Sequence, residues 1–263
     1  MDLNLDKKVV FIAGSSRGLG YATAAQLARE KAIVIINGRD KEKLDIAAEN
    51  LTNLTEVKIY PFYGDVTDSE FPEKLLEFIK NKFAKLDILI TNAGGPPPGG
   101  FESITDNAWQ NAFELSFLSH VRLIRTLLPL LRLSKTANVL TITSYSVKQP
   151  IPNLILSNSI RAATIGLTKT LALELGHEGI RFNSVLPGWT KTERVNTLME
   201  NRAKLNNSSI EEEIIKQSHE SPLRRMAEPA EFADIATFLV SPRASYLTGT
   251  MLSIDGGMVK GIF

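Results

Sequence analysis

A glycine-rich stretch near the amino terminus, AGSSRGLG, has the composition of a phosphate-binding loop. Gly14, Gly18 and Gly20 would permit a tight turn, close approach of the backbone to a ligand, and close packing of a following helix. A helix that begins there presents free backbone N–H groups to an anion such as a pyrophosphate. We therefore predict that this loop, with Ser16 and Leu19 among its members, binds a dinucleotide cofactor.

Two arginines near this loop indicate which dinucleotide it would bind. The adenosine ribose should meet the end of the second strand, where an acidic side chain favours a free 2′-hydroxyl and an arginine favours a 2′-phosphate. In the stretch IINGRD, Gly38 stands where the acid is expected and Arg39 follows it. Arg17 lies within the loop, and two guanidinium groups suit bidentate pairing with one phosphate. The sequence thus favours NADP(H) over NAD(H), unless the arginines are ordinary surface charges.

A second candidate for chemistry is the pentapeptide SNSIR, in which Ser157 and Arg161 are four residues apart. Positions i and i+4 share a face of a helix, so both side chains would point at the same ligand. Arg161 could donate to ribose hydroxyls, whereas an aliphatic hydroxyl without a separate base exchanges protons poorly. The alternatives are that Ser157 caps the start of a helix and that Arg161 is a surface or ribose contact.

Strands and helices alternate along the chain and would position these residues. Short runs rich in β-branched residues predict buried parallel strands, namely KKVVFIAG, KAIVIING, EVKIYPFYGD, LDILITNAG, NVLTITS, IRFNSVLPG and TGTMLSIDGG. Apolar spacing near 3.6 predicts helices over 19–29, 71–83, 108–131 and 159–175. Such alternation requires right-handed crossovers, so we expect a doubly wound parallel α/β sheet of Rossmann type with helices on both faces. A closed (β/α)₈ barrel would need eight repeats.

The chain shows no low-complexity linker, charge block or repeat, so we expect residues 1–263 to form a single domain. Residues 190–221 interrupt the alternation with a polar helical stretch. An insertion beyond the carboxyl end of a strand is placed to cover a ligand, so we expect this segment to cover the substrate. The three glutamates at 211–213 suit a solvated helix start.

Composition argues against several classes of partner and site. Thirty basic and 29 acidic residues leave a net charge of +1, so no long-range field gathers nucleic acid or an anionic membrane, and we expect a small-molecule substrate. The absence of cysteine excludes disulfides and thiolate chemistry, and the three histidines are too scattered to predict a metal site. The first apolar run covers only residues 9–13, which is shorter than a signal or membrane segment and favours a cytoplasmic protein.

Further motifs, in order, resemble those of the short-chain dehydrogenase/reductase family over essentially the whole chain. AGSSRGLG is similar to that family's TGxxxGxG, with Ala13 in place of threonine, and TNAG is similar to NNAG. GDVTD resembles the adenine-contacting segment, LPGWTKT the PG motif, and SPLRRMAEP through IDGG the carboxyl-terminal signature. The resemblance implies an oxidoreductase that binds a nicotinamide cofactor and forms a homodimer or homotetramer. It adds these residues to the cofactor site: Asp65, Val66, Asn92, Ala93, Gly94, Pro187, Gly188, Thr190 and Thr192.

The family's catalytic pattern, an Asn, a Ser and a Tyr-x-x-x-Lys pair, is kept at one position only. Ser144 matches the serine that hydrogen-bonds the substrate carbonyl, while Ser116 replaces the asparagine. Ser157 replaces the tyrosine and Arg161 the lysine. We therefore expect a non-standard site of Ser144, Ser157 and Arg161, in which Ser144 polarises the carbonyl and Arg161 places the ribose. Tyr145 could replace the missing phenol if the preceding strand ends before it.

Two functions follow from this pattern. The first is an NADP(H)-preferring oxidoreductase acting on a small carbonyl or alcohol, such as a 3-oxoacyl thioester, and the second is an inactive NADP(H)-binding sensor or scaffold. Turnover of a carbonyl substrate separates them. The proline-rich run at 96–100 follows a cofactor-contacting strand, and is either a stiff connector or an apolar wall of the substrate cleft.

Overall fold

The computed structural model describes residues 1–262, and these form a seven-stranded sheet in which every pairing is parallel. The spatial order is β3-β2-β1-β4-β5-β6-β7, so the order reverses between β1 and β4. The expected doubly wound sheet is therefore confirmed. The strands are β1 (Val9–Ile12), β2 (Ile33–Gly38), β3 (Tyr60–Tyr63), β4 (Ile88–Thr91), β5 (Asn138–Ile142), β6 (Arg181–Pro187) and β7 (Met251–Ile254).

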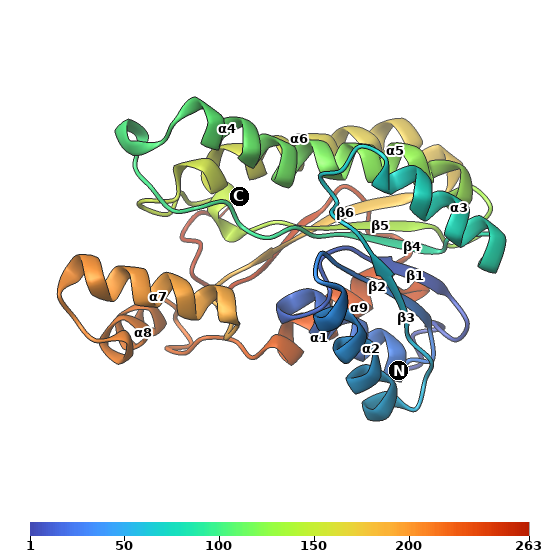
Figure 1. The fold of residues 1–263 in the computed structure, drawn as a ribbon, viewed down its shortest axis with the longest axis horizontal. Helices are drawn as coiled ribbons and strands as arrows, with labels where there is room; N and C mark the ends of the chain where they lie inside the picture. The colour runs from blue at the N-terminus through green and yellow to red at the C-terminus, as the bar shows by residue number, and fades with distance from the viewer. Residues whose placement is uncertain (263) are drawn as a thin grey trace.

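Helices cover both faces of the sheet (Figure 1). One layer holds α1 (Gly18–Arg29), α2 (Lys41–Thr55) and α9 (Pro229–Val240). The other holds α3 (Phe71–Phe83), α4 (Asp106–Phe113), α5 (Ser119–Leu131) and α6 (Ile155–Leu175). Side chains of a strand point alternately to the two faces, so Val10 and Ile12 join the first layer's core while Val9 and Phe11 join the second. Burial on both faces explains why β1 is apolar throughout.

The helix expected over 108–131 is divided into α4 and α5 by a π-helical turn, Glu114–Leu118. Thr164 Oγ1 of α6 donates to the carbonyl oxygen of Ser116 within this turn at 2.9 Å, which ties the turn to α6. The chain stays helical from Asp106 to Leu131, so the predicted helix is confirmed, with a π-helical turn inside it that apolar spacing does not reveal.

Two helices, α7 (Glu193–Asn206) and α8 (Ile210–His219), pack on each other beside the two layers (Figure 1). Ser209 and Glu212 form a capping box at the start of α8, in which each side chain accepts a backbone N–H of the other residue. Within residues 1–262, no helix combines the length and apolar character needed to cross a membrane.

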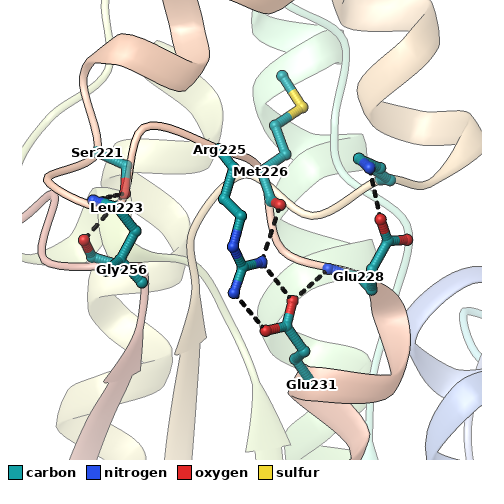
Figure 2. A network of polar contacts seen from close by, with 8 residues as sticks. Ser221, Leu223, Arg225, Met226, Glu228, Glu231 and Gly256 are labelled. Atoms are coloured by element: carbon teal, nitrogen blue, oxygen red, sulfur yellow. Dashed lines mark hydrogen bonds and ion pairs between the residues drawn. The ribbon is translucent and has the colours of Figure 1, made fainter.

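The chain returns from α8 to α9 through a network of polar contacts (Figure 2). Arg225 makes two hydrogen bonds of 2.6 Å to the carboxylate of Glu231, which also accepts the backbone N–H of Glu228 and so caps α9. Ser221 Oγ donates to the carbonyl oxygen of Gly256 at 2.9 Å. These bonds give a physical role to the SPLRRMAEP motif: it fixes the entry to α9 against the turn that follows β7.

Candidate active site

The glycine loop is a tight turn between β1 and α1, as its sequence predicts. Gly14 and Gly18 have φ angles of +55° and +60°, a region that disfavours residues with a Cβ. A Cβ at Gly20 would lie only 2.6 Å from the carbonyl oxygen of Gly14, so any side chain there would collide with the loop backbone. The cap residue Arg17 gives no side-chain bond to the first turn of α1. The N–H groups of that turn therefore suit the phosphates of a dinucleotide.

The ends of β2, β4 and β6 meet this loop. Asn92 Nδ2 donates to the carbonyl oxygen of Gly14 at 3.0 Å, and a Cβ at Gly18 would lie 3.8 Å from Thr192 Cγ2. Asn37, at the end of β2, accepts the Gly14 N–H at 3.1 Å. Asn37 was not identified from the sequence. An amide side chain in an otherwise apolar strand could have indicated it.

The remaining residues of the predicted cofactor site also lie at the carboxyl ends of the strands. Pro187 ends β6, Gly188 passes so close to the backbone of Asp255 that a Cβ would lie 2.7 Å from its Cα, and Thr190 is buried. Val66 and Ala93 are buried, while a Cβ at Gly94 would meet nothing within 4 Å. Leu19 packs against the core beneath the loop.

The two arginines expected at the 2′-phosphate are each in an exposed ion pair. Arg39 Nη1 is 3.6 Å from Asp65 Oδ2, and Arg17 pairs with Glu193 at the start of α7. A Cβ at Gly38 would lie 3.1 Å from Ser16 Cβ, so Ser16 adjoins the end of β2. Exposed ion pairs contribute little free energy, so an incoming phosphate could replace either carboxylate.

Ser144 follows the end of β5 in an extended conformation and precedes a 3₁₀ turn, Tyr145–Val147. Its Oγ accepts the backbone N–H of Ser146 at 3.1 Å, which leaves its own proton available for a second partner. The side chain is half-buried. This arrangement suits a hydroxyl that donates to a substrate carbonyl.

Arg161 is 7% exposed, and its guanidinium joins the ends of β4 and β5 to α6. Nη1 donates to the carbonyl oxygens of Ile142 at 3.3 Å and Thr143 at 3.1 Å, and Nη2 donates to that of Ala93 at 3.5 Å. Burial lowers its pKa to about 10, with a contribution from the charge of Arg194, so the group stays protonated at neutral pH. The surface-charge alternative is therefore wrong, and a ribose contact would have to use its remaining N–H groups.

Ser157 is the third residue of α6, one helical turn before Arg161, and is half-buried. The helix cap is Leu154, which makes no side-chain capping bond, so the alternative of Ser157 as the cap is wrong. The neighbouring Asn158, which sequence reasoning missed, holds the preceding loop by bonding the N–H and the carbonyl oxygen of Ile151 at 3.3 and 2.9 Å.

A buried polar cluster lies behind this centre, and it too was missed. Ser116 Oγ is buried without a hydrogen-bond partner in the described chain, and His120 follows one turn later on α5. His120 Nδ1 is 2.8 Å from Thr91 Oγ1, which is 3.1 Å from Thr141 Oγ1. Burial, reinforced by the charge of Arg161, lowers the pKa of His120 to about 3, so the imidazole is neutral at physiological pH.

Tyr145 meets the geometric condition for facing inward, because β5 ends at Ile142. It is 5% exposed and packs edge-on against Trp189, with ring centroids 6.3 Å apart. Its hydroxyl is the neighbour of the indole N–H, and Trp189 Nε1 is buried with no formed hydrogen bond within residues 1–262. Burial raises the pKa of Tyr145 to about 12, the opposite of the acidification that a catalytic phenol requires.

A cavity of about 510 Å³ is lined by Tyr145 and Trp189 together with residues of the loop before α6 and of the α7–α8 pair. Pro98 of the proline-rich run lines it, and the carbonyl oxygen of Pro96 accepts a hydrogen bond from Arg194 at 2.6 Å. The glutamate run does begin α8, but Glu213 is not solvated. It is 4% exposed and accepts bonds of 2.8 Å from both Asn206 and Ser208, which lowers its pKa.

Comparisons with known proteins extend over essentially the whole chain. The profile of a family described as enoyl-(acyl carrier protein) reductase matches residues 13–259. The uncharacterised oxidoreductase YvrD of Bacillus subtilis is 32% identical, with 100% of both chains covered.

Two solved structures share the fold. L-sorbose reductase from Gluconobacter frateurii, complexed with NADPH and L-sorbose, superposes with a TM-score of 0.94 at 31% identity and 100% coverage of both chains. An NADPH-bound short-chain oxidoreductase from Pseudomonas aeruginosa PAO1, described as containing an atypical catalytic centre, superposes with a TM-score of 0.88 at 27% identity, covering 97% of this chain and 99% of that one.

Proposed function

Because the chain belongs to the short-chain dehydrogenase/reductase family of NAD(P)-dependent oxidoreductases, we propose that it reduces a small carbonyl compound with NADP(H) through a non-standard active site. The observation that carries the proposal is the position of Ser144. Its Oγ lies at the carboxyl end of β5 with its proton uncommitted, while the buried cation of Arg161 holds the same end of the sheet.

The residues present fit a dinucleotide, because the glycine loop has no room for side chains where the phosphates would approach. When bound, NADP(H) supplies the hydride. Ser144 would donate to the carbonyl oxygen and orient it, and Arg161 would favour the negative charge that develops there. Ser157, on the same face of α6 as Arg161, would contact the substrate or the nicotinamide ribose.

Proton supply distinguishes this site from one built on a phenol and a lysine. The two ionisable groups that adjoin it have pKa values far from neutrality, about 3 for His120 and about 12 for Tyr145. Neither is poised to deliver a proton at pH 7. We assign the proton to a water molecule, which protonates the alkoxide and is left as hydroxide. Tyr145→Phe should therefore leave the shape of the pH–rate profile between pH 6 and 9 unchanged.

We infer the preference for NADP(H) from Arg17 and Arg39, whose exposed guanidinium groups could exchange their carboxylate partners for a 2′-phosphate. NADPH-bound relatives such as L-sorbose reductase support the same cofactor. A homodimer or homotetramer, a cytoplasmic location and a cover formed by residues 190–221 complete the proposal. These three rest on the family resemblance and the sequence.

The test is NADPH oxidation followed by absorbance at 340 nm over a panel of ketoses, 2- and 3-oxo acids and 3-oxoacyl thioesters. We expect turnover of at least one class, lost in Ser144→Ala and kept in Ser159→Ala, which removes an exposed hydroxyl of α6. NADPH binding with no turnover of any carbonyl would instead establish the sensor or scaffold.

A further inference from the structure

The cavity beside the active centre is lined by both apolar and charged groups. Leu154, Leu198 and Met258 line it together with the three cations Arg202, Lys216 and Lys260. Tyr145 and Trp189 also line it, and Tyr145 directly follows Ser144 in the chain. A substrate whose carbonyl meets Ser144 could therefore extend its other end into the cavity.

Arg202 is held in a fixed position without a carboxylate of its own. Its guanidinium carbon lies 4.9 Å from the ring centroid of Trp189, a cation–π arrangement, and Nη1 donates to the side-chain oxygen of Gln217. Gln217 is 2% exposed, and its side-chain N–H donates a hydrogen bond to the carboxylate of Glu220. A neutral amide therefore separates the guanidinium of Arg202 from this carboxylate. Within residues 1–262 the side chain of Arg202 makes no other hydrogen bond, so its remaining N–H groups can bind a ligand in the cavity.

The lining carries three cations against two carboxylates. Glu213 accepts its hydrogen bonds from the neutral groups of Asn206 and Ser208, and Glu220 from Gln217, while the charges of Lys216 and Arg202 also help to lower the pKa of Glu213. Within residues 1–262, no ion pair joins Arg202, Lys216 or Lys260 to a carboxylate. The lining thus keeps a surplus of positive charge.

Trp189 contributes a second feature that points to an oxygen-bearing ligand. Its Nε1 is buried and has no acceptor among the described residues, and a buried N–H left unpaired costs free energy that a ligand oxygen would recover. Trp189 carries this donor beside Arg202, and both residues line the cavity. The cavity therefore offers N–H donors from both side chains to an acidic oxygen.

We propose that the substrate is an anionic carbonyl compound whose carboxylate or phosphate binds Arg202 and Trp189 Nε1 in this cavity while its carbonyl meets Ser144. The apolar lining accommodates the carbon chain between the two groups. The reduction of this carbonyl at Ser144 rests on the proposed function. The binding of the anion rests on the cavity alone.

The experiment compares matched charged and neutral carbonyl compounds. The first pair is 7-oxooctanoate and its methyl ester, and the second is dihydroxyacetone phosphate and dihydroxyacetone, so the pairs separate carboxylate from phosphate. We expect one anion to exceed its neutral counterpart in kcat/KM by about 10- to 100-fold, the range for a hydrogen bond to a charged group. Arg202→Gln should abolish that advantage, and Arg202→Lys should keep part of it.

Lys204→Gln is the matched control, because it removes an exposed cation two residues away on the same helix that does not line the cavity. Binding is read separately from turnover by the fluorescence of Trp189 in a Trp109→Phe background saturated with NADP⁺. An anion that binds but is not reduced would sink the proposed function and leave this inference standing. Equal kcat/KM for charged and neutral partners, unchanged in Arg202→Gln, would overturn the inference and leave the function intact.

Discussion

Replacing Arg161 by methionine tests whether this arginine stabilises the fold or only binds the ribose of the cofactor. Three long hydrogen bonds from a charged donor contribute about 1.5 kcal/mol each, or about 4–5 kcal/mol together. Burial costs part of that gain, because lowering the pKa of this guanidinium to about 10 corresponds to about 3 kcal/mol. The net contribution to the free energy of unfolding is then about 1–2 kcal/mol.

We therefore expect Arg161→Met to lower the Tm of the cofactor-free protein by roughly 2–8 °C, at about 2–4 °C per kcal/mol for a chain of this size. The Tm of Arg161→Lys should lie between those of wild type and Arg161→Met, because an ammonium cannot reach all three carbonyl oxygens. Differential scanning calorimetry without nucleotide measures the effect, with Lys204→Met as the exposed-cation control. A Tm within 1 °C of wild type, together with a tenfold loss of NADPH affinity, would refute the structural role and leave a pure ribose ligand.

Three further predictions concern the cofactor, the buried imidazole and the loop. Arg39→Ala should raise the Kd for NADPH about tenfold and leave that for NADH unchanged in calorimetric titrations, since only NADPH carries the 2′-phosphate; equal losses for both would count against it. The His120 pKa of about 3 lies below its unfolded value of about 6.5, so the unfolded chain takes up the proton first as the pH falls and stability is lost in that window. Urea denaturation should show about 2 kcal/mol lost between pH 7 and 5 that is missing in His120→Gln, and identical pH slopes would contradict the assignment. Gly20→Ala should lower the Tm and weaken NADPH binding more than tenfold, because the new Cβ would lie 2.6 Å from the Gly14 carbonyl oxygen. Gly166→Ala, whose Cβ would meet nothing within 4 Å, should leave the Tm unchanged or raise it.

The fold was predictable because its signals are local. Each buried strand is a short apolar run, and the glycine loop stands directly between a strand and a helix, so neighbouring residues decide both. The positions of Gly14, Gly18 and Gly20 follow from the turn itself, which only glycine can make at such close approach.

Much of the candidate site was not predictable because it depends on contacts between distant parts of the chain. Arg161 bonds a carbonyl oxygen 68 residues away, and Asn92 bonds one 78 residues away. Arg202 lies in a polar helix whose sequence reads as a solvated surface, and only the fold places it against Trp189. Glu213 is buried for the same reason, since the packing of α8 on α7 decides which glutamate of the run faces inward.

Single-turnover oxidation of NADPH by wild type and Ser144→Ala, with a saturating carbonyl substrate from the panel, tests the central claim most directly. A hydroxyl that donates to the developing oxyanion contributes about 10²- to 10³-fold to the rate. We expect a loss of that size in the hydride-transfer rate of Ser144→Ala, with NADPH affinity within twofold of wild type. An unchanged transfer rate in Ser144→Ala would contradict it.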